Sequence, residues 1–255
     1  MKLLIDYGGT YIRYELNGSY KKIESKNINI VQFIEDKIKQ FPIKTVGISF
    51  AGQVDDGIMR SAPNIAVPKN FNIKKYFKEL YGIDVFIEND LKCAAVAESI
   101  YFKCNYIATV YVGTGIGAGF VEKKLIRGYK NLAGELGHIP YKETRFTCGC
   151  GKNNCLELTC SGKALSIRNL KNISDDENFR LEFNNALNYA IEVVSILLNP
   201  KIIVLGGGVI EHNRVKIEPK LPNFTDVELE ISRIKDAPME GLKFLMKDGA
   251  EDERR

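Results

Sequence analysis

Four side chains that suit a tetrahedral metal ion lie close together in the sequence. His138, Cys148, Cys150 and Cys155 follow one another at spacings of ten, two and five residues. One imidazole and three thiolates form a complete ligand set for Zn²⁺, and the glycines around Cys-x-Cys let the backbone turn toward one ion. Four protein ligands leave no open position, so such a metal would be structural rather than catalytic. The competing interpretation is a buried thiol cluster beside a structural histidine.

Three glycine-rich turns, each after an apolar run, have the composition of phosphate-binding loops. Glycine has no Cβ atom, so backbone N–H groups can approach anionic oxygens. None of the turns is a Walker loop or a complete dinucleotide fingerprint, and a single glycine turn is as often a tight hairpin. An acid beside the first turn could hold hydrated Mg²⁺ while the turn faces phosphate. The candidate nucleotide-binding residues are Asp6, Gly8, Gly9, Thr10, Thr114, Gly115, Gly207 and Gly208.

Alternating strands and helices must position these residues. Hydrophobic periodicity and turn residues predict strands and helices in both halves of the chain. Within the first half, a loop over 51–70 separates the strand at 45–50 from the helix at 73–81. The predicted strands are 2–6, 11–16, 20–25, 45–50, 84–87, 106–112, 201–205 and 226–234, with 120–126 as a hairpin arm. The predicted helices are 30–40, 73–81, 90–102, 156–170, 176–198 and 238–247. Two strand-to-glycine-turn units, one in each half, suggest duplicated α/β domains.

A series of motifs resembles the ROK family, which comprises sugar kinases and repressors. The motifs are Asp6-Tyr7-Gly8-Gly9-Thr10, Glu88-Asn89-Asp90, Gly113 to Gly119, Gly134-Glu135-Leu136-Gly137-His138, the Cys148-Gly149-Cys150-Gly151 cluster with Cys155 and Glu157, and Leu205 to Gly208. The resemblance implies an α/β, two-domain actin-like ATPase (ribonuclease H-like) fold with a cleft between the domains. We expect an N-terminal domain over 1–105, completed by a C-terminal helix at 238–255, and a second domain over 106–237 that carries the zinc-binding loop.

The resemblance also implies roles for individual residues. Asp90 matches the catalytic base of the family, although an Asp at the start of a helix is by itself most often an N-cap. Asn89 would bind a ring hydroxyl, and His138 would face the sugar with the ring nitrogen that does not bind zinc. The implied sugar-binding residues are Gly52, Asn64, Asn89, Asp90, Glu135, His138 and Glu157. The alternative for the two glutamates is exposed charge. Tyr11 stands where the family often has Lys.

The function that the resemblance implies is ATP- and Mg²⁺-dependent phosphorylation of a hexose primary hydroxyl, with glucose the leading substrate and zinc structural. N-acetylmannosamine or N-acetylglucosamine kinase is the alternative within the kinases, and polyphosphate is an alternative phosphoryl donor. A sugar-responsive regulator or a non-catalytic sugar sensor is the alternative of another class. Because the first strand begins at Lys2 we expect no DNA-binding domain ahead of it. A homodimer is compatible with the resemblance, but the 160–206 stretch is shorter than is usual in the family.

Composition narrows the function classes further. The formal net charge is +4, with basic residues scattered along the chain, so nothing favours nucleic acid as a partner. No stretch approaches the roughly 18 apolar residues of a membrane span, and the N-terminus is charged too early for a secretion signal. The crowding of three of the six cysteines into one short segment indicates metal binding in a reducing compartment. We therefore expect a cytoplasmic protein.

Overall fold

The computed structural model describes residues 1–61, 70–223 and 225–252, which fall into two compact units. The first unit contains Met1–Ala97, Arg127–Ala133 and the chain from Ile234 onward. The second contains Glu98–Ile126 and Gly134–Arg233. The chain therefore passes from one unit to the other four times, and helix α3 (Asp90–Tyr101) begins in the first unit and ends in the second.

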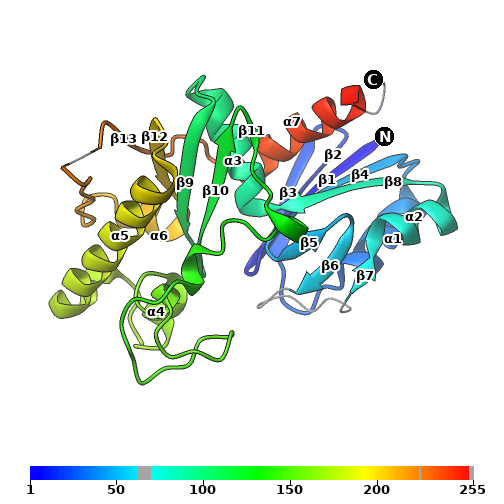
Figure 1. Cartoon of the computed structure of the whole chain (residues 1–255). Coiled ribbons are helices and arrows are strands. Elements are labelled where there is room, and N and C mark those ends of the chain that lie inside the picture. Colours follow the sequence, from blue (N-terminus) through cyan, green and yellow to red (C-terminus); the bar gives the residue numbers. More distant parts are fainter. Residues whose placement is uncertain (62–69, 224, 253–255) are drawn as a thin grey trace. The chain divides into compact units, whose positions relative to one another are not determined.

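The first unit is built on a five-stranded mixed sheet (Figure 1). Strands β1, β4 and β8 are parallel, whereas β1, β2 and β3 form an antiparallel meander, giving the order β3-β2-β1-β4-β8. A second, three-stranded sheet contains β5, β6 and β7. The bounds are β1 Lys2–Tyr7, β2 Tyr11–Leu16, β3 Ser19–Glu24, β4 Thr45–Phe50, β5 Gln53–Asp55, β6 Ile58–Ser61, β7 Phe71–Asn72 and β8 Asp84–Asn89.

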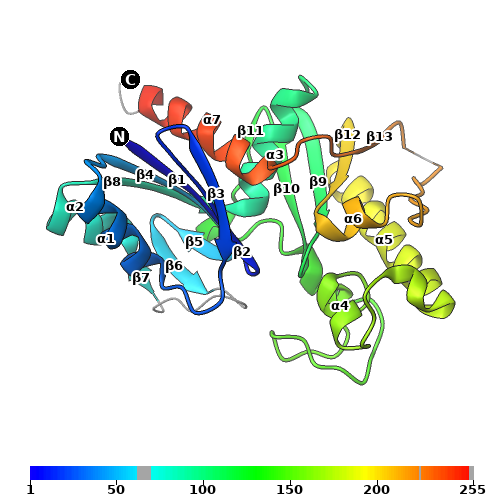
Figure 2. The ribbon, with the colours of Figure 1, turned by 180° about the vertical axis from the view of Figure 1, so that it is seen from behind.

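Helices cover both faces of this sheet because alternate residues of its strands are apolar on each side. Leu3 and Ile5 of β1 belong to the core that includes α1 (Ile30–Gln40) and α2 (Ile73–Tyr81). Leu4, between them, packs in the cluster formed by α7 (Ala237–Asp252), which lies along β1 and β4 (Figure 2). The C-terminal helix therefore supplies the second hydrophobic layer of the N-terminal sheet.

The second unit repeats the same strand pattern. Its sheet has the order β11-β10-β9-β12-β13, with β9, β12 and β13 parallel and β9, β10 and β11 antiparallel. Helix α5 packs near β9, and its buried face forms most of the helical side of the core. The bounds are β9 Tyr106–Val112, β10 Ile116–Glu122, β11 Lys124–Leu125, β12 Ile202–Gly206, β13 Glu228–Ile231, α4 Gly162–Ser166, α5 Glu177–Leu198 and α6 Gly208–His212. The 3₁₀ turns of this unit are Leu136–His138, Leu156–Leu158 and Ile173–Asp175, and a further one, Tyr129–Asn131, belongs to the first unit.

The predicted continuous helix over 156–170 is wrong. The structure has a 3₁₀ turn at Leu156–Leu158 and then α4, because Ser161 is extended and its hydroxyl accepts a hydrogen bond from the N–H of Ala164 as an N-cap. The predicted loop over 51–70 is wrong in its first part, where β5 and β6 form a hairpin around Asp56 and Gly57. Strand β10 also begins earlier than predicted and includes Gly117 and Gly119.

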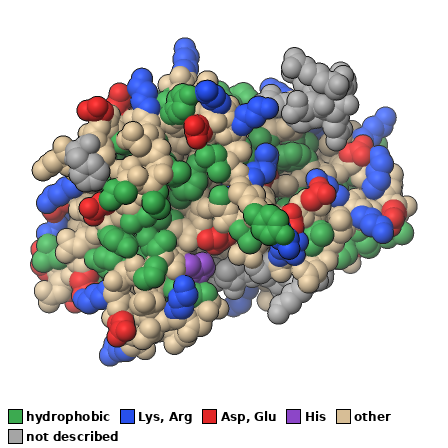
Figure 3. All heavy atoms as spheres, in the orientation of Figure 1, with side chains coloured by type: hydrophobic (Ala, Val, Ile, Leu, Met, Phe, Trp, Pro, Cys, Tyr) green, Lys and Arg blue, Asp and Glu red, His purple; other side chains and the backbone are tan. Residues whose placement is uncertain are grey.

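Across the described residues, no helix combines the length and apolar character that crossing a membrane requires. On the face drawn in Figure 3, basic and acidic side chains are interspersed, without a continuous basic stripe.

Candidate active site and metal centre

In the first unit Asp6 lies at the end of β1 with a polar neighbour on each side. Sheet register sets these neighbours, because Asp6 pairs with Arg13 of β2 and with Ser49 of β4. Arg13 Nη1 lies 2.8 Å from Asp6 Oδ2, and Ser49 Oγ donates to Asp6 Oδ1 at 2.9 Å. Protein donors therefore hold both carboxylate oxygens of Asp6 in place. A carboxylate fixed in this way is suited to accept hydrogen bonds from the water molecules around a hydrated metal ion.

Two carboxyl groups of the first unit have raised pKa values. Burial, reinforced by the charge of Asp236 and opposed by Arg13 and Ser49, raises the pKa of Asp6 to about 6. Burial, followed by the nearby charge of Asp6, raises the pKa of Asp90 to about 7. A partly buried carboxyl that titrates near neutrality can accept a proton at physiological pH, which is the property required of a general base.

Asn89, rather than Asp90, performs most of the capping at the start of α3. Asn89 Oδ1 accepts hydrogen bonds from the N–H groups of Leu91 and Lys92, each at 3.1 Å. Asp90 Oδ1 accepts from Leu91 N at 2.9 Å and from Asn89 Nδ2 at 3.2 Å. No other described residue donates a hydrogen bond to Asp90 Oδ2. One oxygen of Asp90 is thus fixed, and the other remains available for a substrate proton.

The amide group of Asn89 is already engaged within the protein. Its Nδ2 donates to Gly52 O and to Asp90 Oδ1, both at 3.2 Å, while its Oδ1 caps α3. These contacts bring Gly52, Asn89 and Asp90 together at the ends of β4 and β8. The sugar contact expected of Asn89 stays a prediction, and it would have to be shared with these internal hydrogen bonds.

The raised pKa of Asp90 predicts a pH-dependent gain of stability in Asp90→Asn. Because the folded-state pKa lies above the ordinary aspartate pKa of about 3.8, the contribution of Asp90 to stability is full below about pH 4 and is lost as the pH rises through about 7. Asparagine removes the charge and keeps a hydrogen-bond acceptor, so at pH 8 the variant should be more stable by ~2 kcal/mol. Thermal unfolding at pH 8 and pH 4 measures the difference.

The control for this experiment is Asp84→Asn, which changes an exposed carboxylate at the start of β8, the strand that precedes Asp90. Relative to the unmodified protein, Asp84→Asn should not be more stable at pH 8 than it is at pH 4. An Asp90→Asn variant that is stabilised equally at both pH values, or destabilised at pH 8, would contradict the assigned titration.

The glycine turns leave backbone N–H groups free. In the first turn Gly8 N donates to Tyr11 O, while the N–H groups of Gly9 and Thr10 have no acceptor in the described part of the chain. In the turn between β9 and β10, the N–H groups of Thr114 and Gly115 likewise have no acceptor among described residues. Free, adjacent amides are what an anionic oxygen requires, so both turns are suited to phosphate.

The third turn requires glycine for steric reasons. Gly207 has a φ of +90°, and a Cβ atom there would lie 2.6 Å from Val112 O. Gly208, where α6 begins, has open space around its missing Cβ. The end of β12 therefore approaches β9 more closely than any other residue type would permit.

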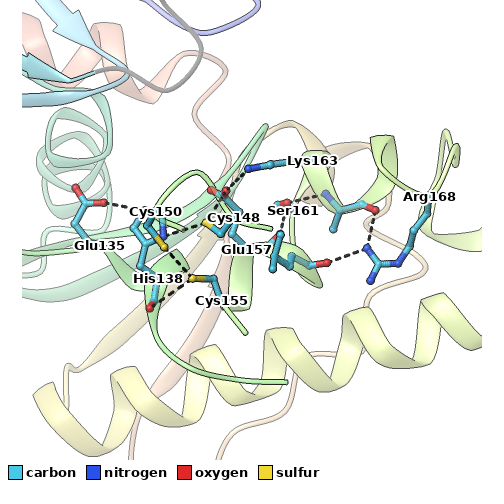
Figure 4. A network of polar contacts seen from close by, with 11 residues as sticks. Glu135, His138, Cys148, Cys150, Cys155, Glu157, Ser161, Lys163 and Arg168 are labelled. Carbon is cyan, nitrogen blue, oxygen red and sulfur yellow. Dashed lines mark hydrogen bonds and ion pairs between the residues drawn. The ribbon is translucent and has the colours of Figure 1, made fainter. Parts of the chain in front are cut away.

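In the second unit the four predicted metal ligands come together (Figure 4). Their ligand atoms all lie within 4.8 Å of one another. Cys148 Sγ is 3.5 Å from His138 Nδ1, and Cys150 Sγ is 3.3 Å from Cys155 Sγ. Ligand atoms about 2.0–2.3 Å from a tetrahedral Zn²⁺ are separated by roughly 3.5–3.8 Å, so the spacing fits this ion.

The donor chemistry of the cluster also fits zinc. None of the three cysteines forms a disulfide, and Cys148 and Cys155 are buried. Burial, followed by the neighbouring thiols, raises the pKa of Cys155 to about 12, so a bound cation would be needed to hold it as a thiolate. The three thiols and one imidazole therefore have the composition and placement of a structural zinc site.

Two acids predicted to bind sugar lie beside the metal cluster. Glu135 Oε2 is 3.9 Å from His138 Nε2, the ring nitrogen directed away from the cysteines (Figure 4). Glu157 Oε1 is 3.3 Å from Lys163 Nζ and 3.8 Å from Cys148 Sγ. A Cβ atom on Gly115 would lie only 2.6 Å from Glu157 Oε2, so glycine is required where this carboxylate meets the turn. His138 thus connects the cluster with Glu135, and Glu157 connects it with the turn at Gly115.

Some polar residues of the site escaped the sequence interpretation. Arg13 and Ser49 could have been found from the register of β1 with its neighbours, but Lys163 carries no local signal. Glu88, adjacent to the Asn-Asp pair, is 3% exposed and is bound by Arg127 Nε at 2.8 Å and Asn131 Nδ2 at 2.7 Å. One predicted sugar-binding residue, Asn64, lies outside the described residues.

Comparison with known proteins identifies the fold. The protein-family model described as "ROK family" matches residues 3–233 of the sequence. The structure is similar to a ROK family glucokinase from Streptomyces griseus in complex with glucose and AMPPNP, with a TM-score of 0.75, 22% identity, and 97% and 99% of the two chains covered. A ROK family transcriptional regulator, a homologue of E. coli MLC protein, gives a TM-score of 0.77 at 24% identity, covering 97% of this chain and 78% of that one. The predicted two-unit, actin-like ATPase fold is confirmed.

Relatives by sequence include both enzymes and regulators. The N-acetylmannosamine kinase of Vibrio cholerae is 30% identical over 239 residues, which cover 81% of this chain and 83% of the kinase. The xylose repressor of Bacillus subtilis is 28% identical over 239 residues, which cover 82% of this chain and 61% of the repressor. The alignment with the repressor thus spans less than two thirds of that protein.

Proposed function

Because the chain belongs to the ROK family, we propose that it is a sugar kinase that transfers the γ-phosphoryl group of ATP to the primary hydroxyl of a hexose, with glucose the leading substrate. The observation that carries this proposal is the state of Asp90. Its Oδ1 is fixed by Leu91 N and Asn89 Nδ2, no other described residue donates to its Oδ2, and burial and the charge of Asp6 raise its pKa to about 7.

In the proposed reaction Asp90 Oδ2 accepts the proton of the sugar hydroxyl. As the oxygen of the sugar hydroxyl forms a bond to the γ-phosphorus, the bond between the γ-phosphorus and the β-γ bridging oxygen breaks and ADP leaves. The loose transition state of phosphoryl transfer places most of the demand on positioning, which the two hydrogen bonds to Oδ1 serve. Bound Mg²⁺ would neutralise charge on the phosphates. Asp6, held by Arg13 and Ser49, is the group proposed to orient the water shell of that ion.

The remaining roles follow the same proposal. The free amides of Gly9, Thr10, Thr114 and Gly115, with Gly8, Gly207 and Gly208, are assigned to the nucleotide phosphates. Gly52, Asn64 and Asn89, together with Glu135, His138 and Glu157, are assigned to the sugar. Carboxylates suit this task because each accepts several hydrogen bonds from a polyol. The zinc cluster would fix the ring of His138 and thereby the group that faces the sugar.

A sugar panel tests the proposal. ADP formation is measured by a coupled assay with zinc-loaded protein, ATP and Mg²⁺ on glucose, mannose, fructose, N-acetylglucosamine and N-acetylmannosamine. We expect turnover of at least one hexose, with glucose giving the largest kcat/KM. Polyphosphate replaces ATP in a parallel series. Absence of ADP above the rate without sugar, for every member of the panel, would refute the proposal.

N-acetylmannosamine kinase is the second candidate within the same reaction class. It is supported by the Vibrio cholerae relative, which is 30% identical over most of both chains. A larger kcat/KM for N-acetylmannosamine than for glucose would select it, and in that case the role proposed for Asp90 would stand unchanged.

A sugar-responsive regulator is the candidate of a different class, supported by the xylose repressor relative. A regulator or a silent sensor binds sugar without turnover. Calorimetric binding of a sugar together with an absence of ADP formation would therefore favour this class over the kinase.

A further inference from the structure

A cavity of about 260 Å³ lies in the second unit beside the segment that precedes Cys148. None of the residues that line it is assigned above to metal, sugar or nucleotide. The lining residues are Lys142, Glu143, Thr144, Arg145, Phe146, Thr159, Arg168 and Glu182. Its volume is below the range of sites for drug-sized ligands, roughly 300–1,000 Å³, so a smaller ligand would fit it.

Two guanidinium groups of this cavity share one aromatic ring. Arg145 Cζ and Arg168 Cζ each lie 5.0 Å from the ring centre of Phe146. Arg168 Nη1 donates to Leu158 O at 2.8 Å and to Ala164 O at 3.0 Å, which fixes the group (Figure 4). Nε and Nη2 of Arg168 are left without an acceptor among the described residues. A fixed, planar donor with unused N–H groups is suited to bind phosphate.

The charges around the cavity do not balance. Of the two lining acids, Glu182 forms an ion pair with Lys142 at 2.7 Å. Neither Arg145 nor Arg168 has a carboxylate within 4.0 Å in the described part of the chain. Burial lowers the pKa of Arg168, while the nearby charge of Glu182 raises it and the charge of Arg145 lowers it to a lesser extent. Arg168 therefore has an acid nearby but no ion pair, and an anion in the cavity could accept from its unused N–H groups.

Thr159 provides an independent observation. It is 1% exposed and lines the cavity, yet its hydroxyl has no hydrogen-bond partner among the described residues. The hydroxyl oxygen is not itself fully buried, since the fully buried side-chain atoms without a partner among the described residues are Ser25 Oγ, Glu98 Oε2 and Asn131 Oδ1, so it can donate to a ligand in the cavity. A ligand oxygen in the cavity would complete its hydrogen bonding.

We propose that this cavity, formed by Arg145, Arg168 and Thr159, is a binding site for the phosphate group of a small molecule, distinct from the site of phosphoryl transfer. The two guanidinium groups supply charge and directed N–H donors, and the Thr159 hydroxyl supplies a further donor. Inorganic phosphate and a sugar phosphate share this chemistry. The site borders the segment before Cys148, so its occupant would contact the loop that carries the metal ligands.

Heteronuclear NMR on the full-length, zinc-loaded protein tests the proposal without any measurement of turnover. Inorganic phosphate and glucose 6-phosphate are titrated separately at constant ionic strength, and the amide signals of Thr144, Arg145, Phe146 and Thr159 are followed. We expect saturable shifts with at least one of the two ligands. The ligand that binds more tightly identifies the source of the phosphate group.

Three variants make the result specific. Arg145→Gln removes an exposed charge, and Thr159→Val removes the hydroxyl at nearly constant volume. Each should raise the dissociation constant for the cavity about tenfold, which is ~1.4 kcal/mol. The matched control is Arg233→Gln, whose side chain is 63% exposed and is not among those that line the cavity, and it should bind as the unmodified protein does. Thermal unfolding verifies that each variant is folded.

The proposal is overturned if neither ligand shifts these amides at millimolar concentration. It is also overturned if folded Arg145→Gln and Thr159→Val proteins bind as the control does. These outcomes are independent of the proposed function, because a protein without kinase activity could still bind phosphate here, and an active kinase could fail to do so.

Discussion

Asp90→Asn is expected to lower kcat for sugar phosphorylation by roughly 10²–10⁴-fold, the range that a positioned general base contributes. The amide side chain keeps the size of the carboxylate and can still accept hydrogen bonds from Leu91 N and Asn89 Nδ2. It cannot accept the proton of the sugar hydroxyl. Because the interaction is lost mainly in the transition state, sugar affinity should change little.

Steady-state kinetics of the coupled reaction and calorimetric titration with sugar measure the two quantities separately. In the unmodified enzyme kcat/KM should rise with pH through about 7, since the base acts only when it is ionised. The matched control is Asp84→Asn, which changes an exposed carboxylate at the start of β8, the strand that precedes Asp90, and it should keep full activity. An Asp90→Asn enzyme that retains kcat within tenfold would remove Asp90 from the role of base.

Loss of the metal is expected to have the second large effect. Cys148→Ser or Cys155→Ser should abolish binding of one equivalent of zinc and lower the free energy of unfolding of the second unit by several kcal/mol. Structural zinc sites in small peptides contribute on the order of 10 kcal/mol to folding, and neither the loop nor its small apolar cluster can replace that contribution. Elemental analysis and thermal unfolding with and without chelator provide the measurements.

Cys104→Ser is the matched control for the cysteine variants. Cys104 is buried in the same unit, lies outside the metal cluster, and donates through Sγ to Tyr106 O, a hydrogen bond that serine can also make. It should keep zinc and most of its stability. Chelator-treated protein that binds no zinc, yet unfolds at the same temperature as the untreated protein, would contradict the structural role.

The sequence predicted the features that depend on local pattern. The strands of the two five-stranded sheets other than β10 and β11, the helices α1, α2, α5 and α7, and the four metal ligands follow from periodicity, caps and close spacing. The Asp-Gly pair at Asp56 and Gly57, both with positive φ, is itself a strong hairpin signal, which the abundance of polar residues nearby obscured. The break at Ser161 was missed because the apolar residues on each side keep a helical period.

Features that depend on distant residues could not be predicted in this way. The donors that hold Glu88 come from Arg127, which is charged, and from the neutral amide of Asn131, about forty positions along the chain. The ion pair of Glu157 with Lys163 and the approach of Glu157 to Gly115 likewise require the folded loop. Burial raises the pKa values of both Asp6 and Asp90, with the charge of Asp236 adding to the rise at Asp6 and the charge of Asp6 adding to the rise at Asp90, and neither cause has a local sequence signature.

The packing of α7 against the first sheet has a consequence for biosynthesis. Leu4 and Phe86 belong to the cluster closed by Met239 and Leu242, so one side of the N-terminal sheet remains uncovered on the ribosome until α7 has been translated. The second unit, by contrast, ends at Arg233, before α7 begins. Nascent chains should therefore acquire protease resistance first in the second unit, and the first unit should depend on chaperones until α7 has been made.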